Sequence, residues 1–389
     1  MGLAMFLAAG LASARAEDCP PLAKIASVKL QHPANSSRII VPVTINGVPK
    51  KFLLDTAGLA GLITKEAADE LNLWSPPFSS LVKEVKTVGL GDRTFVLAET
   101  ISNDSTLISA KNPTDPNRDS DIDGTLVNTF LLNHGEMDLD FAGGTLNLFS
   151  PEHCPGKINY WGAQDIDYLP LSDNTIEIGR LNLYMAPSDI KLKFDIGHLT
   201  VPVMLDGHSF NGWIDTSAEH SSISLEAAER IFNLHKSDLG PASEAKMYPA
   251  AILGFVSNRN GQSVISKEVY HRKFSTLSVG HIGIKNLDLL IAPDREGRNN
   301  DWERVINYAP QIHRKSGWNL DVVEWTREAG IGEVPDATLT NSHKDAPDMV
   351  LGMDVLRHLH IYLSPKEKRM YFSVGAAPSS TPGSAAATK

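Results

Sequence analysis

The sequence predicts an all-β fold with short helices, arranged as two lobes related by internal duplication. Residues 39–71 and 199–231 match without a gap at a constant offset of 160 positions. In each copy, apolar residues flank an Asn-Gly or Asp-Gly pair, a pattern typical of two strands joined by a tight hairpin turn. The chain has 389 residues, and single cores rarely grow beyond about 250 to 300 residues. We therefore expect a bilobal molecule.

The composition is that of a folded globular protein. Apolar residues make up 42% of the chain and charged residues 21%, which argues against wholesale disorder and against a membrane protein. The formal net charge of −10 is spread along the sequence without long basic runs. A nucleic-acid partner is therefore not expected.

Each copy of the repeat leads a strand to an aspartate. Residues 41–45 and 201–205 are predicted as first strands, and the apolar residues 52–54 and 212–214 bury the second strands that end at Asp55 and Asp215. The positions identical in both copies, in first-copy numbers, are Val41, Pro42, Val43, Gly47, Asp55, Thr56, Ile63, Glu66, Ala67 and Ala68. Asp55 and Asp215 therefore occupy equivalent positions.

Small residues follow each aspartate, and a helix start follows them. Ala57-Gly58 and Ser217-Ala218 allow close approach of the backbone at the turn. Thr64 and Ser224 are predicted N-caps, each followed by a glutamate in the first turn of an alanine-rich helix. The aspartates are thus expected on loops held between regular elements.

A later element also recurs. Residues 122–126 and 350–354 each place a glycine in an apolar setting, and the simplest interpretation makes Gly124 equivalent to Gly352. Strand-like runs follow at 137–141 and 360–363. The longer interval in the second copy predicts an insertion at about 295–347.

These motifs resemble the retropepsin-like and pepsin-like aspartic proteases. The resemblance rests on an apolar-Asp-Thr-small-small loop after a strand, followed by an apolar-apolar-Gly element, and it covers most of both lobes. It implies a bilobal acid-protease fold, catalytic roles for Asp55 and Asp215, and bracing of the two loops by Thr56 and Thr216. Ala57 and Ser217 stand where the family usually has glycine.

The activity that the resemblance implies is peptide-bond hydrolysis. Two carboxyls in one site share a single proton, because their mutual repulsion raises one pKa. One group then acts as base toward a water molecule and the other as acid toward the carbonyl. The reaction needs no metal or other cofactor, and its substrate is a peptide or protein. An inactive peptide-binding or scaffolding protein and a structural export protein remain alternatives.

A covering hairpin, or flap, is a further implication. Residues 87–92 are the first-lobe choice because of their glycines, and residues 252–255 or 258–262 are choices in the second lobe. Ordinary surface hairpins are the competing interpretation of each.

The beginning of the sequence predicts export. An apolar run at 3–12 precedes Ala14-Arg15-Ala16, a small-residue cleavage pattern. We expect a signal peptide at 1–16, a periplasmic or secreted protein without a membrane anchor, and a Cys19–Cys154 disulfide formed in an oxidising compartment. The expected divisions are an N-terminal lobe at 17–150, a linker with lobe-start strands at 151–190, a C-terminal lobe at 191–375 and a disordered tail at 376–389. A monomer should suffice, because one chain holds both halves.

Overall fold

The computed structural model of the chain describes residues 19–32, 37–57, 61–75, 82–97, 106–110, 122–174, 198–239, 243–247, 265–292 and 348–375. Most regular structure in these ranges is β-strand, and the helices are short. The strands form two eight-stranded sheets and one six-stranded sheet. The predicted all-β class with short helices is confirmed.

The first eight-stranded sheet contains the first copy of the repeat. Its strand order is β5-β8-β4-β9-β3-β2-β6-β7, and helix α1 follows β4. The bounds are β2 Ile40–Ile45, β3 Val48–Asp55, β4 Leu62–Thr64, α1 Lys65–Glu70, β5 Val82–Glu84, β6 Thr87–Leu90, β7 Arg93–Val96, β8 Thr106–Ala110, β9 Gly124–Val127 and α2 Asn128–His134.

The second eight-stranded sheet contains the second copy. Its order is β13-β14-β15-β20-β16-β19-β18-β17. The bounds are β13 Ser172–Asn174, β14 His198–Leu205, β15 His208–Ile214, β16 Ser222–Ser224, α3 Leu225–Phe232, β17 Ser243–Met247, β18 Ile265–Val279, β19 Ile282–Ala292, β20 Met349–Leu351 and α7 Met353–Leu356.

The two copies fold alike down to their turns. Strands β2 and β3 pair from Ile45↔Val48, and β14 and β15 pair from Leu205↔His208 at the same place in the repeat. Both turns have positive φ at both central residues, 50° and 82° in one and 45° and 84° in the other, as Asn-Gly and Asp-Gly turns favour. Each turn side chain then holds the next hairpin, because Asn46 accepts from the backbone of β6 and Asp206 from that of β18.

The predicted helix caps are present in both copies. Thr64 Oγ1 accepts from the Ala67 amide at 3.1 Å, and Ser224 Oγ accepts from the Ala227 amide at 3.1 Å. The alanines of α1 and α3 are buried against their sheets, so a small residue is what each helix face requires.

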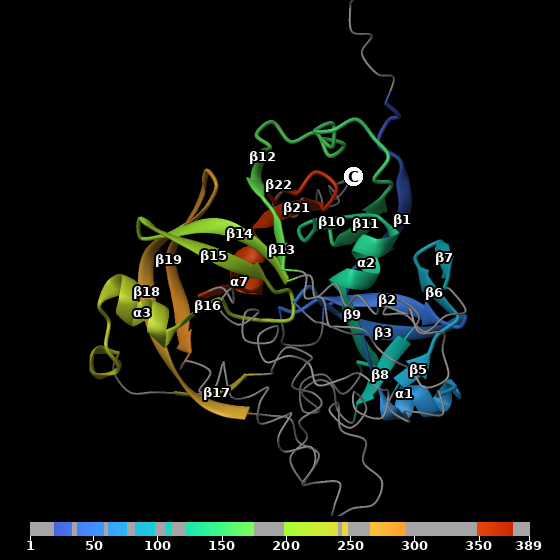
Figure 1. Cartoon of the computed structure of the whole chain (residues 1–389), viewed down its shortest axis with the longest axis horizontal. Coiled ribbons are helices and arrows are strands. Elements are labelled where there is room, and N and C mark those ends of the chain that lie inside the picture. Colours follow the sequence, from blue (N-terminus) through green and yellow to red (C-terminus); the bar gives the residue numbers. More distant parts are fainter. Residues whose placement is uncertain are drawn as a thin grey trace, which may run out of the picture.

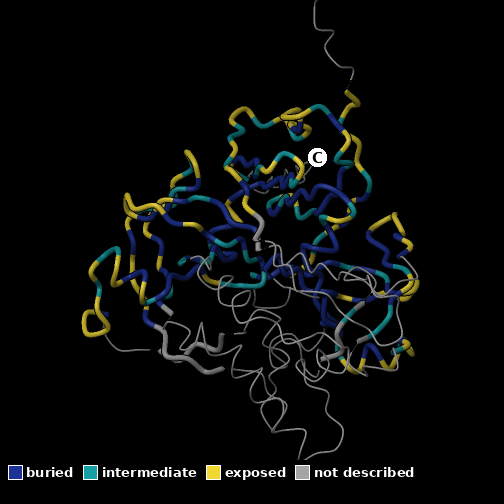
Figure 2. The backbone as a smooth tube through the Cα atoms, viewed as in Figure 1, coloured by how far each residue is buried: buried dark blue, intermediate teal, exposed yellow. Residues whose placement is uncertain are grey.

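The six-stranded sheet joins the two halves. Its order is β1-β11-β10-β21-β22-β12, so the central antiparallel pair β10·β21 relates equivalent strands of the two halves. The sheet lies between the two lobes, at the top of Figure 1, and buried residues run along all three sheets (Figure 2). Its bounds are β1 Lys24–Lys29, β10 Glu136–Asp140, β11 Thr145–Phe149, β12 Asp167–Pro170, β21 Leu359–Ser364 and β22 Arg369–Val374. The palindromic strand order is that of a pseudo-twofold axis.

One face of this sheet carries a buried polar network around Glu136. Glu136 is 1% exposed and accepts from Tyr362 Oη at 2.7 Å and from Ser364 Oγ at 2.5 Å. His153 Nε2 lies 2.6 Å from the same carboxylate. Tyr362 and Ser364 belong to β21 of the second half and His153 to the segment after β11, so Glu136 of β10 joins three parts of the chain.

Asp138, two residues along β10, forms a second centre on the same face. It is fully buried and bonds His360 Nε2 at 2.7 Å, Asn147 Nδ2 at 2.8 Å and Tyr160 Oη at 2.5 Å. His360 also stacks on Trp161, with ring centroids 4.3 Å apart.

The structure corrects the alignment of the two glycines. Strand β9 pairs with β3 so that Leu126 lies beside Leu54, and β20 pairs with β15 so that Leu351 lies beside the equivalent Ile214. Val127, not Gly124, is therefore the counterpart of Gly352, and the predicted equivalence is wrong by three positions. Gly124 lies only three residues before Val127, and it has the same residue type as Gly352, so the sequence alone favoured the wrong pairing.

Several predictions from the sequence lie outside the described residues. They are the signal peptide at 1–16, Gly58, the second-lobe flap choices at 252–255 and 258–262, the insertion at 295–347 and the tail at 376–389.

The predicted Cys19–Cys154 disulfide is confirmed, with Cα atoms 5.1 Å apart and a sequence separation of 135. It attaches the start of β1 to the segment after β11.

Replacing both cysteines by serine should lower the free energy of unfolding by about 4 to 5 kcal/mol in the chain-entropy model, as measured by urea denaturation. A reductant should destabilise the parent protein and leave the double variant unchanged; equal stability of parent and variant would contradict a stabilising role.

The Glu136–His153 contact predicts a pH dependence of stability. Burial alone lowers the pKa of His153, but its hydrogen bonds to Glu136 and the Cys154 carbonyl, with attraction from Glu136 and Glu367, raise the pKa overall. A raised pKa in the folded state stabilises the fold below the unfolded value of about 6.5, and this stabilisation is lost as pH rises through the folded value.

Glu136→Gln should therefore remove part of the decline in melting temperature that sets in as pH rises above the unfolded value of about 6.5. Breaking such a buried pair typically costs about 3 to 5 kcal/mol. Glu152→Gln is the matched control, because Glu152 is an exposed carboxylate paired with Lys366. The same slope in the parent and in Glu136→Gln would show that this pair does not control the pH response.

Candidate active site

The two aspartate loops begin where equivalent strands end. Leu54 and Ile214 are buried in the cores of the two lobes, so burial of apolar side chains brings each strand end inward. Asp55 is the last residue of β3 and is 5% exposed. Asp215 directly follows β15 and is half-buried.

The threonines after the aspartates join the two loops. The Thr56 amide donates to Thr216 Oγ1 at 3.2 Å, and the Thr216 amide donates to Thr56 Oγ1 at 3.1 Å. Thr56 Oγ1 donates to the Ile214 carbonyl at 2.7 Å, and Thr216 Oγ1 donates to the Leu54 carbonyl at 2.8 Å. Both threonines are 0% exposed. Because every bond has a symmetric counterpart, the pseudo-twofold axis passes between residues 54–56 and 214–216.

Each carboxylate is also held by its own loop. The Ala57 amide donates to Asp55 Oδ1 at 3.1 Å, and the Ser217 amide donates to Asp215 Oδ1 at 2.8 Å. The same oxygen of Asp215 accepts from Ser217 Oγ at 2.7 Å and from the Ala218 amide at 3.1 Å. The loops therefore fix the orientation of both acidic groups.

The absence of glycine at the third loop position causes no backbone strain. Neither Ala57 nor Ser217 is among the described non-glycine residues with positive φ, the conformation that favours glycine. Ala57 is buried, and the Ser217 side chain turns to its own aspartate.

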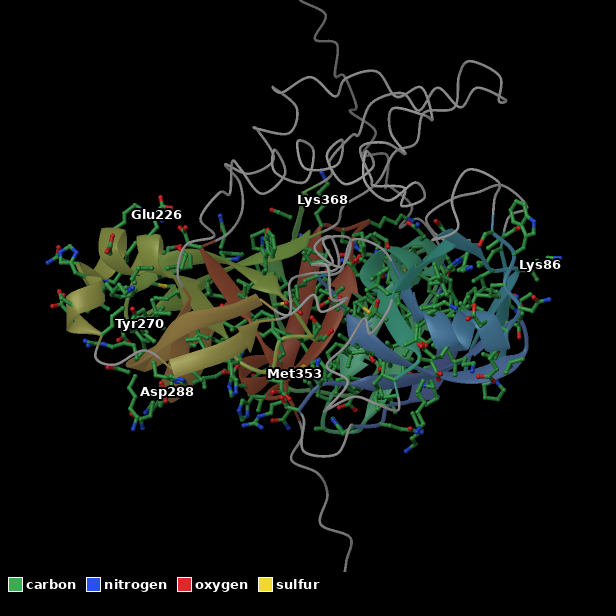
Figure 3. The ribbon with its side chains drawn as sticks, turned by 90° about the horizontal axis from the view of Figure 1, so that it is seen from below. Lys86, Glu226, Tyr270, Asp288, Met353 and Lys368 are labelled. Atoms are coloured by element: carbon green, nitrogen blue, oxygen red, sulfur yellow. A yellow bond between two sulfur atoms is a disulfide. The ribbon has the colours of Figure 1, made fainter. Side chains whose placement is uncertain are left out.

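Helix α7 supports the second loop from below. Gly352 packs so closely on this loop that an added Cβ would lie 2.6 Å from the His220 carbonyl carbon and 2.9 Å from the Ala218 oxygen. Asp354 accepts from Ser221 Oγ at 2.6 Å and from the Ser221 amide at 2.9 Å. In Figure 3 the neighbouring Met353 lies between the two lobes, whose outer ends are marked by Glu226 and Lys86. The requirement for glycine is therefore met in the second lobe, whereas Val127 takes this place in the first.

The hairpin at 87–92 is docked on the six-stranded sheet. Gly91, in the turn of β6–β7, lies so close to β1 that an added Cβ would be 1.8 Å from the Ser27 carbonyl oxygen. Its structural counterpart is the turn of β18–β19, where Gly280 meets Phe372 of β22. Because both turns are packed in this way, the surface-hairpin interpretation holds for 87–92, and the flap role does not.

The described residues contain neither a cluster of metal ligands nor a membrane-spanning helix. Within the part of the chain that the structure describes, no group of three or more His, Cys, Asp and Glu side chains is arranged to hold a metal ion. In the same ranges, no helix is both long enough and apolar enough to cross a membrane.

The threonine contacts predict a shared energetic role. Thr56→Val should leave buried groups of the opposite loop without partners, at about 1 to 3 kcal/mol for each group, whereas Thr56→Ser keeps the hydroxyl and is the control. Thr56→Val and Thr216→Val each remove two different bonds across the same contact between the loops. The double variant should cost less than the sum of the single losses, because a contact already loosened by one substitution loses less from the second. Urea denaturation measures these values. Strictly additive losses, or equal stability of the Val and Ser variants, would contradict the reciprocal bracing.

Comparison with known proteins finds similarity at the level of structure. No protein-family model matches the chain, and no curated protein sequence matches it significantly. A retropepsin-like aspartic protease from Rickettsia conorii aligns with 33% of this chain and 91% of its own, at 16% identity and a TM-score of 0.24. An aspartic proteinase from Irpex lacteus aligns with 92% of this chain and 99% of its own, at 12% identity and a TM-score of 0.37.

Soybean Basic 7S globulin aligns with 91% of this chain and 96% of its own, at 8% identity and a TM-score of 0.41.

The strand topology of this chain itself carries the assignment of its fold: two equivalent lobes, each with an Asp-Thr loop on a common axis, and a six-stranded sheet that joins them. The chain has the bilobal aspartic-protease fold.

Proposed function

We propose that this chain is an aspartic endopeptidase that hydrolyses peptide bonds with Asp55 and Asp215. The observation that carries the proposal is the reciprocal bonding of Thr56 and Thr216. It places the residues next to the two aspartates against each other, although they are 160 positions apart in the chain. Thr56, Ala57 and Gly58 in one lobe and Thr216, Ser217 and Ala218 in the other form the supporting loops.

The chemistry follows from two carboxyls that share one proton. The ionised carboxyl takes a proton from water, whose oxygen attacks the carbonyl carbon of the scissile peptide. The protonated carboxyl donates to the carbonyl oxygen, and the resulting gem-diol collapses as the leaving nitrogen is protonated and the C–N bond breaks. Both loops are braced before substrate arrives, so little reorganisation is needed during the reaction.

Compartment and assembly form part of the proposal. A Cys19–Cys154 disulfide is typical of oxidising compartments, which supports export to the periplasm or beyond through a cleaved signal peptide at 1–16. A peptide or protein is the substrate, and no nucleic acid or membrane anchor takes part. Because one chain supplies both aspartate loops, a monomer is sufficient.

An inactive binding protein with the same fold is the second candidate. It is favoured by Ala57 and Ser217, which replace the glycines usual in the resembled family. Such a protein would bind extended peptides, or pepstatin, without cleaving them.

The test is cleavage of a reduced, alkylated protein at acid pH. Asp55→Asn and Asp215→Asn should each lower kcat/KM by about 10²- to 10⁴-fold or more, because each removes an acid–base group. Asp165→Asn is the control, since Asp165 is an exposed carboxylate outside the loops. Pepstatin should inhibit the parent protein, and activity should fall as rising pH removes the shared proton.

Three outcomes would decide against the peptidase. They are full activity in both aspartate variants, activity that persists unchanged into alkaline pH, and pepstatin binding by a parent protein that cleaves nothing. The last outcome would establish the binding protein instead.

A further inference from the structure

The second aspartate loop is held along its length by one short segment, residues 351–354, at the end of β20 and the start of α7. The Asp215 amide, at the start of the loop, donates to the Leu351 carbonyl at 3.0 Å. In the middle of the loop, the Ala218 carbonyl accepts from the Met353 amide at 2.8 Å. The segment therefore fixes the backbone at the acidic residue and again three residues later.

The far end of the loop is bound by the Asp354 side chain. Its carboxylate accepts the Ser221 amide with both oxygens, at 2.9 and 3.0 Å, and accepts from Ser221 Oγ at 2.6 Å. The Gly352 amide donates to the same hydroxyl at 2.8 Å. Ser221 is 0% exposed, so water cannot replace the carboxylate as its partner without opening the loop, and loss of the carboxylate is costly there.

The same stretch of backbone supplies donors to the acidic group. The amides of Ser217 and Ala218 both donate to Asp215 Oδ1, at 2.8 and 3.1 Å. Ala218 uses its carbonyl on α7 and its amide on the carboxylate, so a movement of Ala218 relative to α7 also moves a donor to Asp215. The direction of these amides therefore depends on how residues 218–221 are anchored.

We propose that Asp354 is a positioning residue, which anchors the second aspartate loop through Ser221 and so keeps the loop amides directed at Asp215. The inference rests on the proposed peptidase function and adds to it a residue outside the aspartate loops. Asp354 acts as a hydrogen-bond acceptor, because an ionised carboxylate accepts only and both of its oxygens are bonded to Ser221.

The surroundings of Asp354 fit this role. Its side chain is 16% exposed, and Nδ1 of the exposed His220 lies 3.9 Å from its Oδ2. A carboxylate with so little access to water needs hydrogen-bond donors, and Ser221 supplies an amide and a hydroxyl. A merely structural pair would stabilise the lobe and leave the loop amides unaffected, whereas a positioning residue controls the direction of those amides.

The first test is amide hydrogen exchange in the full chain, which needs no substrate. Asp354→Ala should speed exchange at the Ser217 and Ala218 amides by about tenfold or more, because the anchor of their loop is lost. The Thr216 amide, which is bonded to Thr56 Oγ1, should keep its protection, since that bond belongs to the contact between the lobes.

The kinetics of cleavage separate positioning from stability. Asp354→Ala should lower kcat by about 10²-fold with little change in KM, because it misplaces a reacting group after the substrate is bound. Asp354→Asn keeps a side-chain oxygen that accepts from Ser221 and should recover most of this loss. Asp348→Asn is the matched control, because Asp348 immediately precedes β20 and pairs with Arg230 of α3; its kcat should equal that of the parent.

Ser221→Ala gives the same measurements in a variant that keeps the amide bond to Asp354. It removes the hydroxyl on which Asp354 and Gly352 both act, so its effects on exchange and kcat should have the same direction and be smaller. Adding Ser221→Ala to Asp354→Ala should change little further, because both break one contact. If Asp354→Ala does not fold, the comparison of Ser221→Ala with Ser221→Thr decides, since threonine keeps the hydroxyl.

Unchanged exchange at the Ser217 and Ala218 amides in folded Asp354→Ala overturns the inference. So does a kcat equal to that of the parent enzyme, or an equal loss of kcat in Asp348→Asn. Faster exchange at these two amides in a chain whose parent cleaves nothing would refute the proposed function and leave the positioning role of Asp354 standing.

Discussion

The reciprocal hydrogen bonds between Thr56 and Thr216 are the constraint on which the rest of the site depends. Each threonine hydroxyl accepts an amide and donates to a carbonyl of the opposite loop, so neither loop is satisfied alone. Both residues are fully buried, where an unmade hydrogen bond is costly. The two lobes must therefore meet at this point for either loop to be stable, and the aspartates next to the threonines are brought along.

The six-stranded sheet supplies the second connection between the halves. Its central pair β10·β21 joins residues more than 200 positions apart, as Asp138↔Tyr362 illustrates. The buried carboxylates of Glu136 and Asp138 each bind side chains from the second half. Buried charges are tolerated only when they are paired and hydrogen-bonded. The two carboxylates have these partners when the two halves are arranged as observed, so the network favours this arrangement. The Cys19–Cys154 disulfide attaches the segment after β11, which supplies His153 to this network, to the start of the first half.

Much of the local structure was predictable from the sequence because it depends on short-range chemistry. Positive φ at Asn-Gly and Asp-Gly, capping by Thr64 and Ser224, and the gapless repeat all follow from neighbouring residues. The equivalence of Val127 and Gly352 was missed, because the pairing of strands that are distant in the sequence determines it. Gly124, three residues earlier, has the same residue type as Gly352 and so gave the better sequence match. The buried role of Glu136 was missed too, since alternating acidic residues in a strand read equally well as a solvent-exposed face. In the sequence, Ser217 was visible only as a departure from the usual glycine. Its hydrogen bond to Asp215 could not be predicted, because the direction of the side chain depends on the folded loop.

A crystal structure of the chain with a statine-containing peptide would test the central claim most directly, because one inhibitor hydroxyl must satisfy both lobes at once. The account predicts that this hydroxyl lies within about 2.6 to 3.2 Å of a carboxyl oxygen of Asp55 and of Asp215 together. An inhibitor that contacts only one of the two aspartates, or that binds away from the paired threonines, would contradict it.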